Sequence, residues 1–373
     1  MKAVLYMVVV HVIVAGMNIL YKLSADGGRM SLRVLVAYRY MFGAAFLCPL
    51  AFFLERKTRT RLTCFILGQA FCCATFGASL NQNLYIAALK MTSATLAVAM
   101  TNLLPAFTFI LAIMFRLERL EIRSSRSQSK VLGTAVGVCG AMLLTFYHGA
   151  KLQLWSFHTH LPHHHPNQHQ SGNQVLGSML AMANTLSYAT WLIIQAKMSK
   201  RYPHPYSSSA LLNLFAAIQS TCVAAITDWD PSAWELRWDV NLLTIIYTGI
   251  LVSGLVVALM SWAIQMRGPL FVSAFNPLSL VIVAFFGSIF LDEALHLGSV
   301  VGAGLIILGL YTVLWGKGKE VKELVQLQAH RSAGEATKLD SDGLHSNPAG
   351  AGIGANQVPE HSIKEDQIDS VQL

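Results

Sequence analysis

The chain has 373 residues, of which 54% are hydrophobic and only 12% charged, whereas a soluble domain carries about 25% charged residues. Its mean hydropathy of +0.49 excludes an ordinary soluble globular protein and predicts a polytopic membrane protein. The net charge of +8 does not predict a nucleic-acid partner, because the basic residues fall in short loops between apolar runs.

Apolar runs of about 17 to 25 residues, the length that spans a bilayer as a helix, recur along the whole chain. We expect ten membrane spans, at residues 2–22, 34–54, 63–88, 93–115, 130–148, 175–196, 206–227, 241–263, 269–291 and 297–315. Because each half has an odd number of spans, the second half enters the membrane with the opposite orientation. The predicted fold is an all-α integral membrane protein, with ten transmembrane helices in two inverted five-helix repeats.

Two stretches that lie 175 residues apart, Ser93–Leu120 and Gly268–Leu295, support this duplication. Each is predicted to be one long apolar helix with an asparagine and a proline early in it. When the stretches are laid over each other without gaps, the shared residues are Ala99 and Ala274, Leu103 and Leu278, Phe115 and Phe290, Glu118 and Glu293, and Leu120 and Leu295. Such duplication is recurrent in secondary transporters, whose substrate site lies between the halves.

The distribution of lysine and arginine predicts the orientation of the chain. If the N-terminus is cytoplasmic, the inner loops carry thirteen of these residues and the outer connections carry six. The positive-inside rule therefore places both termini in the cytoplasm. We expect a first repeat at 1–148, a histidine-rich outer loop at 149–174, a second repeat at 175–315 and a disordered cytoplasmic tail at 316–373.

Polar residues inside the spans are the candidate substrate contacts, because they are costly in hydrocarbon and usually face the bundle interior. Arg39, about two turns into the second span, is suited to hold a carboxylate, and His11, Asn18 and Lys22 share one face of the first span. The predicted substrate contacts are Asn18, Lys22, Arg39, Asn81, Gln82, Asn83, Tyr85, Thr101, Asn102, Trp262, Gln265 and Asn276. Four more residues are expected beside the same cavity: Trp191, Gln195, Asn213 and Gln219. For each residue the alternative is a structural hydrogen bond between helices.

Prolines and the lack of intramembrane carboxylates bear on the mechanism. Pro105 and Pro277 are predicted hinges, because a proline inside a span frees a backbone carbonyl and tends to kink the helix. No Asp or Glu falls inside a predicted span, which favours a facilitator over a carrier driven by protons or sodium. His11 is the one candidate proton carrier. The sequence predicts no cofactor and no metal site, and the six cysteines are interpreted as reduced packing residues.

Several stretches of both halves carry a family likeness. They read VAGMNILYK from Val14, YR at Tyr38, NQNLYIAALKMTSATLAVAMTNLLPAFTFILA from Asn81, WLIIQAKMSKRYPHPYSSSALLNLFAAIQS from Trp191 and SWAIQMRGPLFVSAFNPLS from Ser261. Together they resemble the plant nodulin-like branch of the drug/metabolite transporter superfamily. This branch includes the Walls-Are-Thin-related proteins and the Usually Multiple Acids Move In and out Transporters.

The resemblance implies a ten-helix carrier of two EamA-type repeats, with cytoplasmic termini, in the plasma membrane or the vacuolar membrane. It also implies substrates such as amino acids, often moved in both directions, or auxin. The chain departs from the family pattern in its short segment before the first span and in its dense histidine loop. We therefore predict a secondary transporter of small organic solutes, most readily amino acids, that works by alternating access. The expected partners are the substrate and the lipid bilayer.

Parts of the sequence are also compatible with functions other than amino-acid transport. An auxin or other metabolite exporter of the same superfamily is the nearest alternative. His160, His163 and His164 form an HxxHH pattern, which supplies iron ligands in membrane desaturases, but such enzymes need several of these boxes on the cytoplasmic side. The outer loop instead suits adventitious zinc or copper binding or plain solvation. A receptor without transport activity is disfavoured by the inverted duplication and the paired proline helices.

Overall fold

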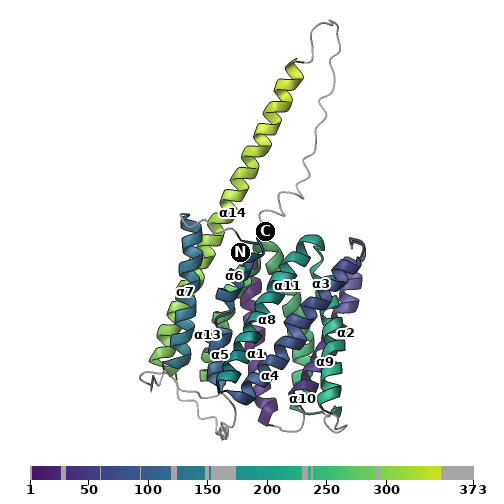
Figure 1. Ribbon diagram of the computed structural model, residues 1–373, viewed down its shortest axis with the longest axis vertical. Helices are drawn as coiled ribbons and strands as arrows, with labels where there is room; N and C mark the ends of the chain where they lie inside the picture. Colours follow the sequence, from purple (N-terminus) through teal and green to yellow (C-terminus); the bar gives the residue numbers. More distant parts are fainter. Residues whose placement is uncertain are drawn as a thin grey trace.

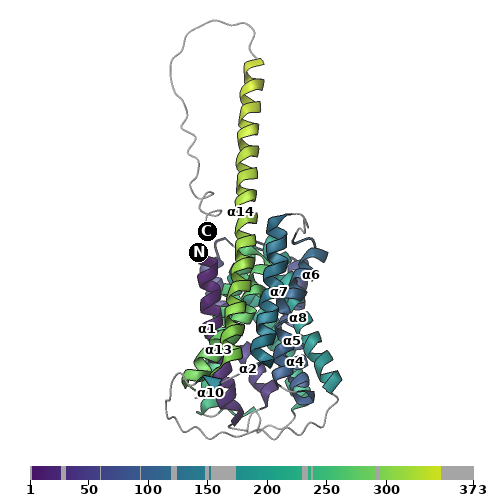
Figure 2. The same cartoon turned by 90° about the vertical axis from the view of Figure 1, so that its left-hand side faces the viewer.

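The structure is a computed structural model that describes residues 2–26, 31–58, 60–92, 94–118, 124–147, 151–152, 174–228, 234–236, 238–290 and 295–345. Its helices form one bundle, from which a single long helix projects at one end (Figure 1). The start of the first helix lies at that same end of the bundle in both views (Figures 1 and 2).

The first half of the chain forms the first of the two repeats. Its elements are α1 (Lys2–Asp26), α2 (Leu32–Glu55), α3 (Cys64–Ala74), the π-helical η1 (Thr75–Ser79), α4 (Leu80–Met91), α5 (Ala94–Thr101), α6 (Leu104–Met114) and α7 (Ser125–Phe146). The elements α3, η1 and α4 follow one another without a break and form one apolar segment of 28 residues.

The second half repeats this order. Its elements are α8 (Gln174–Arg201), α9 (Pro205–Thr227), α10 (Val240–Tyr247), the π-helical η3 (Thr248–Val256), α11 (Val257–Arg267), α12 (Pro269–Ala274), α13 (Asn276–Phe290) and α14 (Leu297–His345). Two short strands, β1 (Lys151–Leu152) and β2 (Leu295–His296), pair antiparallel and connect the ends of the two halves.

The described helices confirm a helical membrane protein. Seven segments are at least 18 residues long and apolar enough to cross a membrane, and two shorter apolar helices, Lys2–Asn18 and Pro269–Val283, occur beside them. The helices α1 and α8, with 25 and 28 residues, are also long enough to span a bilayer. The count of ten spans stays a prediction.

Two expectations about continuous helices were wrong. The stretches Ser93–Leu120 and Gly268–Leu295 are not single helices, since the first is divided into α5 and α6 and the second into α12 and α13. Each break falls just before a proline, Pro105 in the first and Pro277 in the second. A proline has no N–H to donate and its ring clashes with the carbonyl four residues earlier, which explains both breaks.

The predicted disorder of the tail is wrong for residues 316–345. These residues continue α14, which has 49 residues in all. The segment is rich in Lys, Glu, Leu, Gln and Ala, which favour helix, and Lys317 pairs with Glu320 one turn later. Residues 346–373 and nearly all of the histidine-rich loop lie outside the described residues.

The last spans of the two halves, α7 and α14, pack side by side (Figure 2). Glycines allow this close approach. A Cβ on Gly133 would lie 2.7 Å from the carbonyl oxygen of Gly309, and a Cβ on Gly302 would lie 2.8 Å from the carbonyl oxygen of Gly140. Small residues at such a contact let membrane helices approach backbone to backbone, so this pair holds the two halves together.

Candidate functional site

Arg39 lies at the contact between the two halves. It projects from α2, where its side chain is buried. Its Nε donates to Oγ of Ser253 at 2.8 Å and its Nη1 donates to the hydroxyl of Tyr21 at 3.3 Å. The guanidinium carbon lies 5.2 Å from the ring centroid of Tyr40, within reach of a cation–π interaction. These partners are all neutral, so they do not cancel the positive charge of Arg39.

The partner of Arg39 lies in an irregular helical segment. Ser253 belongs to η3, and the corresponding span of the first half contains η1. A shift of 175 residues moves Thr75 onto Ile250 and Ser79 onto Gly254, both inside η3. The duplication therefore extends to the π-helical segments, which occur frequently at functional sites.

Close packing fixes the distance between α2 and η3. A Cβ on Gly43 of α2 would lie 2.7 Å from Cβ of Ser253 and 2.8 Å from Oδ1 of Asn213. Only a glycine therefore fits at this position without a shift of its neighbours. Arg39 lies one turn earlier on α2. The close packing of α2 against η3 brings it within hydrogen-bonding distance of Ser253.

A buried polar seam continues from Ser253 into the second half. Asn213 Nδ2 donates to the carbonyl oxygens of Ser253 and Ser209, at 2.8 Å each. The hydroxyls of Ser209 and Ser261 lie 3.1 Å apart, and Gln195 Nε2 donates to Ser261 Oγ at 3.0 Å. Gln195 and Asn213 were expected beside the cavity, and the structure places both in this seam.

The polar residues from Asn81 to Tyr85 contact different parts of the structure. Asn81 Nδ2 donates to Oδ1 of Asn184 on α8 at 2.6 Å, so this residue joins two helices. Gln82 hydrogen-bonds to Tyr40 and thereby reaches the surroundings of Arg39. Asn83 donates to a carbonyl of its own helix, while Tyr85 packs beside an alanine cluster. Of these four residues, Gln82 is therefore linked to the surroundings of Arg39 through Tyr40.

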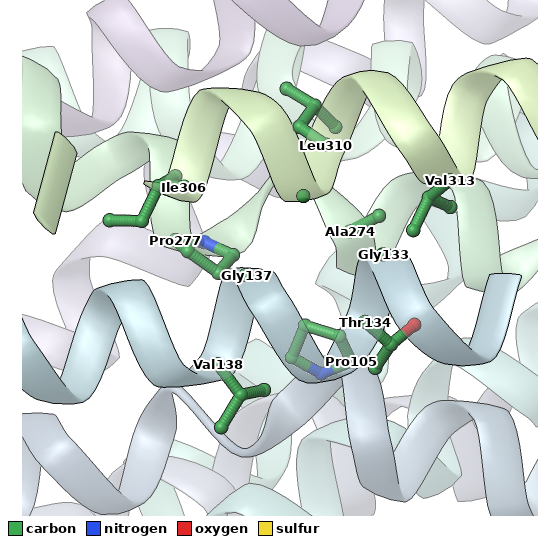
Figure 3. Close-up of a pocket in the computed structure, with 11 residues that line it drawn as sticks. Pro105, Gly133, Thr134, Gly137, Val138, Ala274, Pro277, Ile306, Leu310 and Val313 are labelled. Atoms are coloured by element: carbon green, nitrogen blue, oxygen red, sulfur yellow. The ribbon is translucent and has the colours of Figure 1, made fainter. Parts of the chain in front are cut away.

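The two broken spans meet each other. Asn276 Nδ2, at the start of α13, donates to the carbonyl oxygen of Thr101, at the end of α5, at 3.3 Å. Pro105 and Pro277 both line one small pocket of about 10 Å³, together with residues of α7 and α14 (Figure 3). That volume suits a single water molecule and not an organic solute. The predicted contacts Thr101 and Asn276 therefore bond to each other.

The other predicted contacts lie apart from Arg39. Asn18, Trp262 and Gln265 are exposed on their helices, and the side chain of Lys22 lies outside the described residues. Asn102 is 1% exposed. Their role as substrate contacts stays a prediction.

His11, the predicted proton carrier, has a partner on its own helix. Its Nδ1 donates to the carbonyl oxygen of Met7 at 2.7 Å, and its ring centroid lies 6.2 Å from that of Phe275. The side chain is buried. A proton-carrying role stays a prediction, as do the hinge roles of the two prolines.

A buried ion-pair cluster was missed from the sequence. Glu118, just after α6, accepts from Lys130 of α7 at 2.8 Å and also pairs with Lys317 of α14. Glu320 pairs with Lys130 at 2.6 Å and with Lys317 at 3.2 Å. Arg116 adopts a positive φ of 55°, and this turn brings Glu118 back beneath the helix end. The cluster joins the two halves at the end of the bundle where α14 leaves.

The two halves of the chain match a known protein family. A profile of the EamA-like transporter family matches residues 1–146 and 175–315, which are the two halves described above. A crystal structure of a protein chain with 17% identity superposes with a TM-score of 0.61, covering 83% of this chain and 98% of the other. At that identity the likeness shows a shared fold alone.

Curated relatives in Arabidopsis thaliana match nearly the whole chain. WAT1-related protein At1g68170 is 40% identical over 342 residues, which cover 91% of this chain and 96% of the relative. WAT1-related protein At1g25270 is 39% identical over 353 residues, covering 93% and 98%. WAT1-related protein At5g07050 is 42% identical over 315 residues, covering 82% and 78%.

Proposed function

We propose that this chain, which belongs to the EamA-like transporter family, moves small organic solutes that carry a carboxylate, amino acids first, in both directions. The family membership and the WAT1-related relatives make the chain a drug/metabolite-type transporter in a lipid membrane. Amino acids are the finer proposal. Auxin or another metabolite carboxylate is the alternative substrate.

The observation that carries the proposal is the buried charge of Arg39. A guanidinium held between neutral hydroxyls is costly in a low-dielectric interior, and a carboxylate ligand would relieve that cost with charge-assisted hydrogen bonds. Ser253 and Tyr21 leave part of the guanidinium for such a ligand, because they use Nε and one Nη1 hydrogen of its five donors. Gln82, through Tyr40, would bound the same site.

The location of Arg39 suits alternating access. Its bond to Ser253 joins α2 of the first half to η3 of the second, and a site shared by two halves changes its exposure when one half rocks against the other. We propose ten spans, with both termini in the cytoplasm, in the plasma membrane or the vacuolar membrane. The common end of the bundle at which α1 starts and α14 leaves (Figure 2) supports this topology.

A facilitator is the proposed mode of energy coupling. Glu118 and Glu320, the carboxylates of the buried cluster, are paired with lysines at one end of the bundle and not placed beside Arg39. His11 is engaged with Met7. Transport would then follow the substrate gradient and would not depend on an imposed pH gradient.

The test is uptake and efflux of a panel of radiolabelled amino acids and auxin by the purified protein in proteoliposomes, with and without a pH gradient. We expect saturable amino-acid flux in both directions that is indifferent to the gradient. Flux that follows the gradient would contradict the facilitator and direct attention to His11. Flux of auxin alone would select the alternative substrate, and no flux of any carboxylate solute would refute the proposal.

A further inference from the structure

A patch of basic and aromatic side chains lies at the end of the bundle where α14 leaves. Its cations are Lys197 and Arg201, in the last two turns of α8, and its rings are Phe65 of α3 and Phe115, which follows α6. Lys197 Nζ lies 4.1 Å from the ring centroid of Phe115, and the guanidinium carbon of Arg201 lies 4.4 Å from that of Phe65. Both distances allow a cation–π interaction. Because α8 belongs to the second half and both rings belong to the first, this α8 patch spans the two halves.

The rings of the α8 patch lie on the outside of the protein. Phe65 is 55% exposed and Phe115 is 45% exposed. Further along the same two spans, Phe71 of α3 and Ile110 of α6 are exposed as well. Exposed apolar side chains of a membrane helix face the lipid, and aromatic rings at its ends lie at the headgroup level. A lysine or arginine beside such a surface extends its charged head into the headgroup layer.

The carboxylates that the structure describes at this end of the bundle are engaged elsewhere. Glu118 and Glu320 belong to the buried ion-pair cluster. Glu55 accepts from two backbone N–H groups at the start of α9. None of these three carboxylates forms an ion pair with Lys197 or Arg201. Within the described part of the chain, the two cations of the α8 patch therefore have aromatic partners but no anionic one.

The position of the cations has a simpler partial explanation. The C-terminal end of a helix carries a partial negative charge, which favours basic residues in its last turns, and α8 ends with Lys200 and Arg201. That effect does not explain why exposed rings from two other helices lie against Lys197 and Arg201. The combination of cations, rings and an apolar outer surface instead matches the chemistry of a phospholipid, which has a charged head and apolar chains.

We infer that Lys197 and Arg201 form a binding site for the headgroup of an anionic phospholipid, in the leaflet at the end of the bundle where α14 leaves. The two residues are four positions apart and share one face of α8, so both reach the same headgroup. Arginine and lysine are the side chains that bind phosphate oxygens with charge-assisted hydrogen bonds. The acyl chains would lie along the exposed apolar surfaces of α3 and α6. The lipid would thus contact both halves, whichever solute is transported.

Two further cation–π pairs supply a matched control. The guanidinium carbon of Arg56 lies 5.1 Å from the ring centroid of Phe52, and Lys319 Nζ lies 3.8 Å from that of Trp315. These rings are also exposed. Each pair is formed within four residues of one chain segment, at the ends of α2 and along α14, and the two cations are not neighbours on one helix face. They therefore contribute interfacial charge without forming a shared site.

Lipid binding to the full-length protein tests the site. Phosphatidylserine or phosphatidylcholine is titrated into the delipidated protein in a neutral detergent, and native mass spectrometry gives Kd for the first bound lipid. Wild-type protein should bind phosphatidylserine more tightly than phosphatidylcholine. The double variant Lys197→Gln with Arg201→Gln should raise Kd for phosphatidylserine about twenty- to thirtyfold, since each cation near an anionic headgroup contributes about fivefold. Arg56→Gln with Lys319→Gln, which also removes one arginine and one lysine, should raise it about threefold or less.

Three results would overturn the inference. Equal losses in the two double variants would show that only the general surface charge attracts the lipid. Equal binding of phosphatidylserine and phosphatidylcholine by the wild type would exclude a site for an anionic headgroup. Displacement of the lipid by an equal concentration of inorganic phosphate would indicate a site for a soluble anion. If the double variant of the α8 patch does not fold, Lys197→Gln and Arg201→Gln decide singly: each should raise Kd about fivefold, and an unchanged Kd in both overturns the inference.

Discussion

The guanidinium of Arg39 and the hydroxyl of Ser253 join the two halves of the bundle through a buried hydrogen bond of 2.8 Å. The residues are 214 positions apart in sequence and come from different repeats. This bond places Arg39, the buried cation of the proposed site, on a contact that would change in the proposed movement of the halves.

Replacing Arg39 should weaken the transport of carboxylate solutes selectively. Arg39→Gln removes charge-assisted hydrogen bonds of about 1.5–3 kcal/mol, so KM for an amino acid should rise about ten- to a hundredfold. The matching methyl ester, which lacks the carboxylate, should be transported as by the wild type. If properly inserted Arg39→Gln protein lost transport of the acid and of the ester equally, Arg39 would not bind the substrate carboxylate.

Gly309, at the α7–α14 contact, should tolerate no added methyl group. A Cβ on Gly309 would lie 2.5 Å from the backbone nitrogen of Gly137 and 2.7 Å from the carbonyl oxygen of Gly133, and such overpacking costs about 1–3 kcal/mol. Gly309→Ala should lower the thermal unfolding midpoint. The matched control is Gly304→Ala on the same helix, where the added Cβ meets nothing within 4 Å. Equal midpoints for the two variants would refute the packing account.

Breaking the buried ion-pair cluster should destabilise the end of the bundle where α14 leaves. Glu118 is 2% exposed at its side chain and Glu320 is 21% exposed. Glu118→Gln leaves buried lysines underpaired, at a cost of about 3 kcal/mol or more, whereas Glu320→Gln should cost about 1 kcal/mol or less. Thermal unfolding of both variants in one detergent checks the order. A larger loss for Glu320→Gln would contradict it.

Restoring a helical N–H at each break should slow the transport cycle. Alanine in place of Pro105 or Pro277 favours an unbroken helix by up to about 3 kcal/mol, so turnover should fall several-fold while KM stays nearly constant. Initial rates over a range of substrate concentrations separate the two parameters. If turnover and substrate binding were lost together, the variant would have a folding defect and the hinge role of the proline would be contradicted.

The sequence predicted the parts of this structure that local patterns determine. Apolar runs located the helices, the repeat at 175 residues paired the two stretches in which the breaks occur, and an arginine inside a span indicated a buried cation. The prolines indicated kinks, although each stretch was expected to remain one helix. Both breaks follow from the missing N–H of a proline. The prediction therefore identified the cause correctly but underestimated its effect, since the helix is interrupted and not only kinked.

Contacts between distant residues were beyond local patterns. The bond from Arg39 to Ser253 and the meeting of Asn276 with Thr101 depend on how the halves pack, which residue spacing does not encode. Glu118 lies at a helix end, where a charge is normally solvated, and only the turn at Arg116 and the approach of α14 bury it. The π-helical segments carry no signal in apolar periodicity.

The central claim, that two halves alternate around a carboxylate held by Arg39, is tested most directly by counterflow. Proteoliposomes loaded with an unlabelled amino acid are diluted into a trace of the labelled one, with wild-type and Arg39→Gln protein side by side. The account predicts transient accumulation of label by the wild type, because a carrier exchanges solutes, and its loss in Arg39→Gln. Equal accumulation by both proteins, or none in the wild type with any carboxylate solute, would contradict it.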